Sequence, residues 1–481
     1  MGALPDRFGL ALDASLRRFR QGTVLAGGHP GRVVTLTADG TAALDALVAG
    51  TAGGEDAAAR SAATAALADR LVRSGMAHPR PAPPGTRDDD ATGPDVTVVV
   101  PVLDRADALD RCLAALGTGH PVVVVDDGSR DPARVESVCR AHGARVVRRE
   151  RNGGPGAARN DSLDSVDSEL IAFVDSDCTV LPGWIDDLAW LFEDQAIAAV
   201  APRVVPCPPG ADGTRRAIDR FLAAHSPLDL GPHEGEVGPR RAVPYVPTAA
   251  LLVRRRALAG VGGFATGLRV GEDVDLVWRL VGAGWRVRYV PSVTVEHAEP
   301  RRWRDLLARR FRYGTSAGPL AVRHPGRLAP VELRPWPTVA ALAAVAGRPR
   351  TAIGAVAVSA LLLSRSVRPL GIPSSQAWTW SVQGAGWTVV GIGRAATMLA
   401  APLLVVAAAR GRRGARAALA LTLAPPIVDW VRRRPDLDLP RWVTASVADD
   451  LAYGAGVWTG CVRARSFGPL RPSIGPPPDE S

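Results

Sequence analysis

The sequence feature that most constrains the fold is a short apolar run followed at once by two acids. Residues 170–174 (Leu-Ile-Ala-Phe-Val) are all apolar, which is typical of a strand buried on both faces of a parallel sheet. Asp175 and Asp177 follow directly. Ligands of open α/β sheets bind beyond the carboxyl ends of the strands, and neighbouring carboxylates repel unless a cation lies beside them. The run therefore predicts an α/β sheet with Mg²⁺ or Mn²⁺ at its edge, and a solvated acidic turn is the alternative.

Two apolar runs lie upstream, and the second of them shows the same arrangement. Residues 96–100 and 122–125 are rich in valine, which favours buried strands, and an apolar-periodic helix lies between them. This order is that of a βαβ unit. The second run ends in Asp126 and Asp127, and Gly128 permits a tight turn there. The sequence therefore predicts a second pair of acids at the same sheet edge.

A segment rich in small residues, 152–160, follows a third predicted strand at 144–147. Small residues let the backbone approach a ligand, and the helix that they open can offer amide hydrogens to an anion. Gly154 and Gly156 lack the third glycine of a dinucleotide fingerprint, and the segment does not follow the first strand. The pattern therefore argues against an NAD(P) site.

Acids and a histidine recur further along the chain. Residues 248–253 are predicted to return to the sheet, whereas 206–247 are irregular in pattern and are predicted to be an acceptor-shaping or mobile segment. Asp273 falls in the first turn of a predicted helix, where the dipole favours the ionised form that a general base needs; an ordinary acid-rich helix start is the alternative. His297 follows another predicted strand, and a metal-ligating and a structural role both stay open.

Together these motifs resemble glycosyltransferase family 2, the inverting nucleotide-sugar transferases of GT-A fold. The resemblance covers about residues 96–297, with the motifs in the family's order. It implies a nucleotide-sugar site made of these residues: Pro101, Asp104, Asp126, Asp127, Asn152, Gly153, Arg159, Asn160, Asp175 and Arg310. It also implies that Asp177 and His297 bind the metal and that Asp273 is the general base. Arg310 lies where processive relatives carry a glutamine-arginine-tryptophan signature, but the glutamine and tryptophan are absent here.

Sequence patterns outside this core predict two further parts. Residues 1–82, with short strands at 23–26 and 32–36 and two helices, resemble the winged-helix-like PqqD family of peptide-recognition modules, and a generic α+β domain is the alternative. Residues 83–95 are Pro-rich and charged, which is typical of a linker. The transferase is then predicted over 96–315 and a helical apolar region over 316–481.

The apolar stretches of the last region are broken by arginines. Residues 351–364 are too few to span a bilayer, and 385–409 carry Arg394 within the run. Short apolar helices edged with arginine favour an interfacial hairpin or a monotopic membrane anchor, and a buried helical bundle is the alternative. We therefore expect association with a membrane surface.

Charge and cysteine usage bear on partners and location. Net charge is +10 and all 58 basic side chains are arginine, which favours an anionic partner such as a membrane surface or a phosphorylated substrate. The five cysteines have no metal-binding spacing, which fits a reducing cytosol, and the N-terminal stretch lacks a secretory pattern. We expect a cytoplasmic protein at the inner face of the cell membrane, with no nucleic-acid partner.

The whole arrangement, including residues 449–458, resembles the glycosyltransferases of the mycofactocin system. That resemblance implies a UDP-glucose donor, a peptide-derived redox cofactor (premycofactocin) as the small-molecule acceptor, and extension by β-1,4-linked glucose. It also implies that residues 1–82 contact a peptide or a biosynthetic protein. Transfer to a polyprenyl phosphate or a cell-envelope glycan is one alternative, and a non-catalytic peptide-binding protein is another.

Overall fold

The computed structural model describes residues 4–5, 8–29, 31–49, 62–81, 94–207 and 215–474. The chain divides into two compact units, of which the first comprises Met1–Pro208 and Ser226–Glu299 and the second comprises Pro209–His225 and Pro300–Ser481. Each unit has its own clusters of buried apolar side chains.

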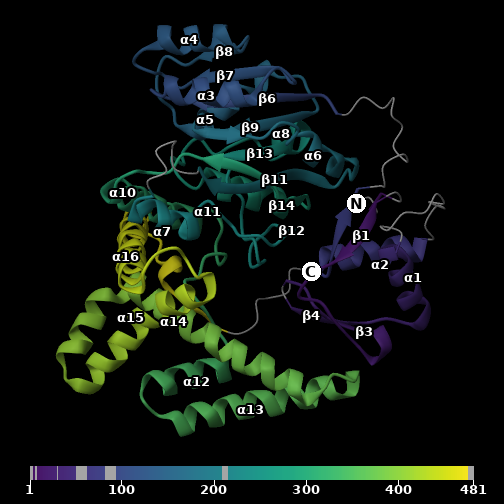
Figure 1. Cartoon of the computed structure of the whole chain (residues 1–481), viewed down its shortest axis with the longest axis vertical. Helices are drawn as coiled ribbons and strands as arrows, with labels where there is room; N and C mark the ends of the chain where they lie inside the picture. The colour runs from purple at the N-terminus through teal and green to yellow at the C-terminus, as the bar shows by residue number, and fades with distance from the viewer. Residues whose placement is uncertain are drawn as a thin grey trace. The chain divides into compact units, whose positions relative to one another are not determined.

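The first unit is built on a nine-stranded sheet of order β10-β14-β11-β13-β9-β6-β7-β8, with β12 paired to β14. Figure 1 labels the strands from β14 through β11, β13, β9, β6 and β7 to β8 in this order. Strands β9, β6, β7 and β8 are parallel as predicted, whereas β13 runs antiparallel to β9 and β11. The strands are β6 (Val96–Val102), β7 (Val122–Asp126), β8 (Arg145–Arg148), β9 (Leu170–Val174), β10 (Cys178–Val180), β11 (Ile197–Pro206), β12 (Gly235–Glu236), β13 (Ala250–Arg254) and β14 (Arg286–His297).

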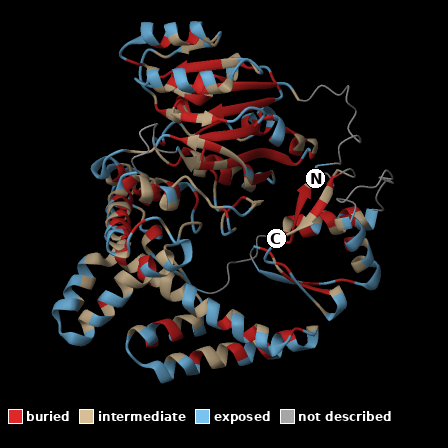
Figure 2. Cartoon of the chain, in the orientation of Figure 1, coloured by how far each residue is buried: buried red, intermediate tan, exposed pale blue. Residues whose placement is uncertain are grey.

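Helices follow the strands because each apolar run ends in a turn and then an amphipathic segment. In α3, for example, Leu109, Cys112 and Leu113 are buried in the core of the sheet. All five residues of β9 are buried, as expected for a strand covered on both faces (Figure 2). The helices of this layer are α3 (Ala106–Leu116), α4 (Pro132–Ala141), α5 (Pro155–Asp161), α6 (Asp186–Ala189), α8 (Arg255–Gly260) and α9 (Glu272–Gly282).

The N-terminal part of the first unit has a small core of its own. The predicted strand pair is present as β3 (Val24–Gly27) and β4 (Arg32–Thr35), joined by β2 (Arg17–Phe19) in one sheet. Strands β1 (Gly9–Leu12) and β5 (Ala77–Arg80) form a second, two-stranded sheet. Helices α1 (Ala38–Ala49) and α2 (Ala62–Arg73) pack on them, and Thr37 Oγ1 caps α1 by accepting from the amide of Gly40 at 3.0 Å. Part of the predicted second helix, and most of the predicted linker, lie outside the described residues.

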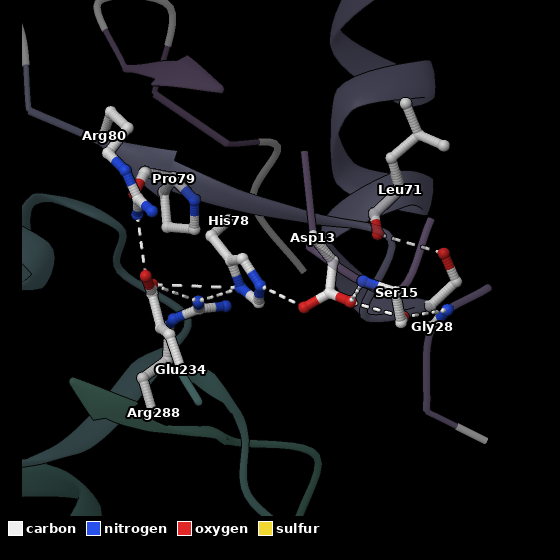
Figure 3. Close-up of polar contacts among 10 residues, drawn as sticks. Asp13, Ser15, Gly28, Leu71, His78, Pro79, Arg80, Glu234 and Arg288 are labelled. Carbon is white, nitrogen blue, oxygen red and sulfur yellow. Dashed lines mark hydrogen bonds and ion pairs between the residues drawn. The ribbon is translucent and has the colours of Figure 1, made fainter. Parts of the chain in front are cut away.

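Buried charges join this N-terminal part to the large sheet. His78 on β5 lies 2.9 Å from Asp13 through Nε2 and 3.2 Å from Arg288 Nη2 through Nδ1 (Figure 3). Glu234 accepts from Arg288 and from Arg80, both at 2.8 Å. If the two parts separated, Arg288 would keep Glu234 but lose His78, and Arg80 would lose Glu234.

The second unit is helical. Its helices are α7 (Ala217–His225), α10 (Trp303–Gly314), α11 (Ala317–Arg323), α12 (Pro335–Val345), α13 (Pro349–Val367), α14 (Ser374–Ala409), α15 (Arg412–Arg433) and α16 (Leu439–Ala464), and β15 (Glu332–Leu333) pairs with β16 (Ser473–Ile474). Helix α7 corrects the prediction that 206–247 is irregular. Its Ile218, Phe221 and Leu222 are buried on one face.

The length predicted for the apolar helices is also wrong. Residues 349–370 form one continuous segment of 22 residues and α14 has 36, so both are long and apolar enough to cross a membrane. The predicted first run ended before Arg365, whereas α13 continues through that arginine, and the second run was begun at 385, whereas α14 already begins at Ser374. Figure 2 shows α13 and α14 largely pale or tan, which means that most of their surface is not buried.

Helix α16 is held against its neighbours by glycines and buried charges. Side chains larger than hydrogen at Gly454, Gly456 or Gly460 would overlap the backbone of the adjoining helices. Asp449 pairs with Arg310 of α10 at 2.8 Å, and Asp450 pairs with Arg394 of α14 at 3.3 Å. The helices therefore approach closely, with their charges paired inside.

Candidate active site

The parallel strands bring two pairs of acids to one edge of the sheet. Strand β6 lies between β7 and β9 and is parallel to both. Parallel strands end at the same edge, so the acids after β7 (Asp126, Asp127) and those after β9 (Asp175, Asp177) share it. This is the juxtaposition that the sequence predicted.

Asp127 joins the end of β7 to the loop that opens α5. Its carboxylate accepts from the amides of Gly153 and Gly154, each at 2.9 Å, and lies 2.9 Å from Arg149 Nε. Gly154 has φ +90°, which a residue with a side chain rarely adopts. The small residues therefore let the backbone of this loop lie against the Asp127 carboxylate. The role of Asp127 and Gly153 in nucleoside binding remains a prediction.

Other residues that were predicted to bind the donor form hydrogen bonds within the protein near this edge of the sheet. Asp126 accepts from the Ser129 amide at 2.8 Å and from Arg148. Asp104 accepts from the amide of Arg130 at 2.8 Å and from its side chain at 2.9 Å. Pro101 lies near the end of β6, and Asn152 directly precedes Gly153. Their predicted contacts to a nucleotide sugar are untested.

Asn160 uses both ends of its side-chain amide on the backbone of Phe264. Its Nδ2 donates to the carbonyl and its Oδ1 accepts from the amide, both at 2.8 Å. Gly263 must be a glycine there, because it has φ +68° and lies against the Asn160 side chain. This contact fixes the segment before α9, and donor binding by Asn160 remains only a prediction.

The predicted metal ligands lie together. Strand β10 pairs with β14 so that Cys178 faces His297, and His297 Nε2 comes within 3.5 Å of Asp177 Oδ1. The exposed Arg105 donates to the other oxygen of Asp177. Sequence reasoning missed Arg105, although an arginine directly after the first strand's acidic loop was a usable signal.

These residues fit a metal that is completed by its substrate. Among the described residues no group of three or more His, Cys, Asp or Glu side chains is gathered for a metal. Mg²⁺ is commonly held by one or two protein carboxylates together with substrate phosphates. Asp177 and His297 supply only two protein ligands. This edge of the sheet is therefore suited to a metal ion whose other ligands are phosphate oxygens of the donor, rather than to an ion bound by protein side chains alone.

The predicted base lies at the start of α9. Gly271 precedes this helix in the left-handed conformation (φ 83°), and Asp273 falls in the first turn. Burial and, to a smaller extent, the adjacent Glu272 carboxylate raise the pKa of Asp273 to about 7, against the lowering effect of the hydrogen bond from the Val274 amide. Asp275 is fully buried and bound to Arg279 at 2.8 Å. Asp273 is therefore better suited than Asp275 to proton transfer.

Arg159 occupies a position that sequence reasoning did not foresee. It was predicted to bind the nucleotide sugar, but its guanidinium lies between Asp175, at 2.6 Å, and Glu272, at 3.0 Å. Glu272 was noted from the sequence only as the acid that precedes Asp273, and its pairing with Arg159, 113 residues away, was not predicted. Arg310 lies in the second unit and is paired there with Asp449, and its predicted contact to the donor is untested.

Comparisons with known proteins identify the class. The model of the family described as "Glycosyl transferase family 2" matches residues 97–260, and the chain belongs to this family. Over nearly its whole length it is similar to the "Pre-mycofactocin glycosyltransferase" of Mycobacterium tuberculosis (strain ATCC 25618 / H37Rv), with 37 % identity over 98 % of each chain. It is also 34 % identical to "Succinoglycan biosynthesis protein ExoU" of Rhizobium meliloti (strain 1021), over 41 % of this chain and 60 % of that protein.

Solved structures resemble the chain less closely. "Mannosyltransferase PcManGT from Pyrobaculum calidifontis in complex with GDP-Man and Mn2+" has 20 % identity and a TM-score of 0.38, over 64 % of this chain and 90 % of that one. Glucosyl-3-phosphoglycerate synthase from Mycobacterium tuberculosis, in complex with Mn²⁺ and UDP, has 20 % identity and a TM-score of 0.32, over 48 % and 80 %. At TM-scores below 0.5 these similarities carry no conclusion about this chain.

Proposed function

We propose that this glycosyltransferase moves glucose from UDP-glucose to premycofactocin, with inversion, and extends it with β-1,4-linked glucose. The observation that carries the proposal is the 37 % identity, over 98 % of both chains, to the relative named pre-mycofactocin glycosyltransferase. The carboxylates at the edge of the sheet support the transferase chemistry, because they supply separate candidates for donor binding and for proton removal.

Asp273 removes the proton from the acceptor hydroxyl in the proposed reaction. A general base works best when its pKa lies near the working pH, and the raised pKa of Asp273 meets that condition. The hydroxyl then attacks the anomeric carbon from the face opposite the departing UDP, and the C–O bond to the diphosphate breaks. Asp127, after β7, holds the nucleoside side of the donor.

Asp177 and His297 would hold Mg²⁺ or Mn²⁺. The ion would stabilise the negative charge that develops on the departing diphosphate. The Arg105 side chain is 60 % exposed and donates a hydrogen bond to Asp177, so it would be a further positive charge beside the same phosphates.

Roles for the other two parts of the chain are proposed from separate observations. Residues 1–82 select the acceptor or hold a peptide or protein that carries it, supported by the separate small core of this part. Helices α12 to α14 hold the protein at the inner face of the membrane, supported by their length and exposed apolar side chains.

One observation favours a second candidate. A lipid-linked acceptor such as a polyprenyl phosphate, or a cell-envelope glycan made on one, would lie beside apolar helices. The two segments that are long enough to cross a membrane would suit it.

A donor and acceptor panel distinguishes these candidates. The full chain in detergent is incubated with UDP-glucose, UDP-galactose or GDP-mannose and with premycofactocin or polyprenyl phosphate, with Mn²⁺ or EDTA. We expect hexose addition to premycofactocin from UDP-glucose only, abolished by EDTA and restored by Mn²⁺, as measured by mass spectrometry. Transfer to the polyprenyl phosphate alone would replace the first candidate with the second, and Asp273→Asn controls for contaminating transferases.

A further inference from the structure

The Arg159 guanidinium is almost completely enclosed by protein carboxylates. Its Nη2 donates to Asp175 Oδ1 at 2.6 Å and its Nη1 donates to Glu272 Oε1 at 3.0 Å. The side chain is 3 % exposed, and the guanidinium carbon lies 5.4 Å from the centre of the Phe264 ring. Two of its three nitrogens are therefore used within the protein, which leaves little of the group for a nucleotide.

The two carboxylates belong to different halves of the site. Asp175 ends the strand that carries the predicted metal ligand Asp177, and Glu272 begins the helix that carries the base Asp273. The neighbouring Asn160 fixes the backbone of Phe264, upstream of the same helix, through two bonds of 2.8 Å. Helix α5 thus holds the start of α9 at two successive residues.

We propose that Arg159 is a positioning residue that joins the donor-binding edge of the sheet to the base helix, and that its charge, by neutralising Glu272, sets the pH range in which Asp273 accepts a proton. The inference rests on the proposed function, because it takes Asp273 as the base.

The charges near Asp273 determine the direction in which its pKa should move when Arg159 or Glu272 is replaced. Burial is the largest cause of the raised pKa of Asp273, Glu272 raises it further, and Arg159 lowers it. The charged groups that act on Asp273 are Glu272 on its own helix and Arg159 on α5. Asp175, directly after β9, is bound to Arg159, and Asp275 is bound to Arg279. Without the arginine, Glu272 would stand unopposed beside the base.

The test is the pH dependence of kcat in three variants. Arg159→Gln removes the positive charge, so the acid limb of the profile should move up by about one to three pH units. Glu272→Gln removes the negative neighbour and should move the limb down. The double variant removes both charges and should return the limb close to its original position, with the affinity for UDP, measured by calorimetry, changed less than threefold in all three.

Each other role for Arg159 gives a different result. If it binds the donor, Arg159→Gln should weaken UDP binding more than tenfold and Glu272→Gln should not restore it, which would overturn the proposal. A role in folding alone should lower kcat by one factor at every pH, without moving the limb, which would also overturn it. If Arg159→Gln does not fold, Glu272→Gln still tests the proposal: its acid limb should move down, and an unchanged limb would overturn the proposal.

Failure of the proposed function is recognised separately. If Asp273→Asn transferred sugar at the normal rate, Asp273 would not be the base. The variants at Arg159 and Glu272 would then be expected to show no opposite shifts. If Asp273→Asn is inactive but the opposite shifts are absent, only the inference about Arg159 fails.

Discussion

The edge of the nine-stranded sheet and the helical unit place their acids differently. In the first unit, the acids of the candidate site lie at one edge of the sheet, where β7 and β9 end, beside an apolar core. In the second unit, Asp449 and Asp450 are buried between helices, whereas Ile353 and Leu361 of α13 are 67 % and 54 % exposed. Apolar exteriors with paired interior charges are typical of helices that face lipid. The exposed apolar side chains of α13 are therefore consistent with the proposed membrane attachment, whereas the acids at the sheet edge suit an aqueous transferase site.

The largest effect is expected at the aqueous site. Asp273→Asn keeps nearly the same volume but cannot accept a proton, so turnover should fall about 10²–10⁴-fold with little change in UDP affinity. In the unmodified protein, Asp273 is protonated below its pKa of about 7, so kcat should fall as the pH drops through this value. Single-turnover rates from pH 5.5 to 8.5 check both statements.

Asp177→Asn is the matched control for that prediction. It should weaken metal-dependent UDP binding as well as turnover, because Asp177 lies on the donor side with His297. Equal loss of UDP affinity in both variants would contradict the separation of donor site and base.

The next largest effect is expected on the stability of the helical unit. Burial alone would raise the pKa of Asp449, but hydrogen bonds from His225 and Arg310 lower it, so this acid is ionised at neutral pH. Asp449→Asn leaves Arg310 without its ionic partner and should lower the free energy of unfolding by about 3–5 kcal/mol. Denaturant unfolding in detergent measures it.

The control lies in the first unit. Asp107 forms an exposed pair with Arg134, so Asp107→Asn should change the free energy of unfolding by no more than about 1 kcal/mol. Similar losses in the two variants would mean that Asp449 is no more important to its unit than a surface charge.

A smaller effect is expected where the N-terminal part meets the sheet. Burial and the neighbouring Arg288 lower the pKa of His78, against the effect of Glu234 and Asp13, so His78 is neutral when docked. An undocked histidine has a pKa near 6.5 and takes up a proton first, so docking should weaken as the pH falls below this value, by at most about 1.4 kcal/mol per pH unit. Asp13 and Glu234 have lowered pKa values, so their contributions are lost only in stronger acid.

Hydrogen exchange of β5 between pH 7.5 and 5.5 checks this prediction. Exchange rates corrected for intrinsic pH dependence should rise toward pH 5.5 in the unmodified protein and stay flat in His78→Gln. An identical rise in both proteins would assign the effect to other groups.

The smallest effect on folding is expected on the apolar helix surface. Ile353→Gln with Leu361→Gln should change the free energy of unfolding by no more than about 0.5 kcal/mol, because both side chains are exposed. The same change should release protein from membranes in flotation assays. Leu181→Gln in the first unit, where Leu181 is 56 % exposed, should release none.

The sequence predicted the sheet edge well because its signals are local. Valine-rich runs define β6 and β7, and such runs have few alternatives to a buried parallel strand. The three residues of β10 are too few to give a pattern, and it was missed although it brings His297 to Asp177. Helix α7 was overlooked because prolines and glycines surround its three well-spaced apolar residues.

Long-range contacts were beyond such reasoning. The partners of Arg159 are 16 and 113 residues away along the chain, so its two ion pairs could not be read from local sequence, and its contact with the donor stays a prediction. The helix lengths of the second unit were misjudged for another reason. Counting uninterrupted apolar residues ignores the fact that a helix carries a single arginine without ending, as α13 does at Arg365.

Strand β14 limits how the first unit can change in evolution. Its first residues, Arg286 and Arg288, contact the N-terminal part, and its last, His297, lies beside Asp177. Insertion of one residue within the paired stretches would move every later side chain of β14 to the opposite face of the sheet and displace His297. The pairing with β11 passes from Val290 directly to Thr294, so the three residues between form a bulge. We expect length differences among homologues to be confined to this bulge, while the paired stretches keep a constant number of residues.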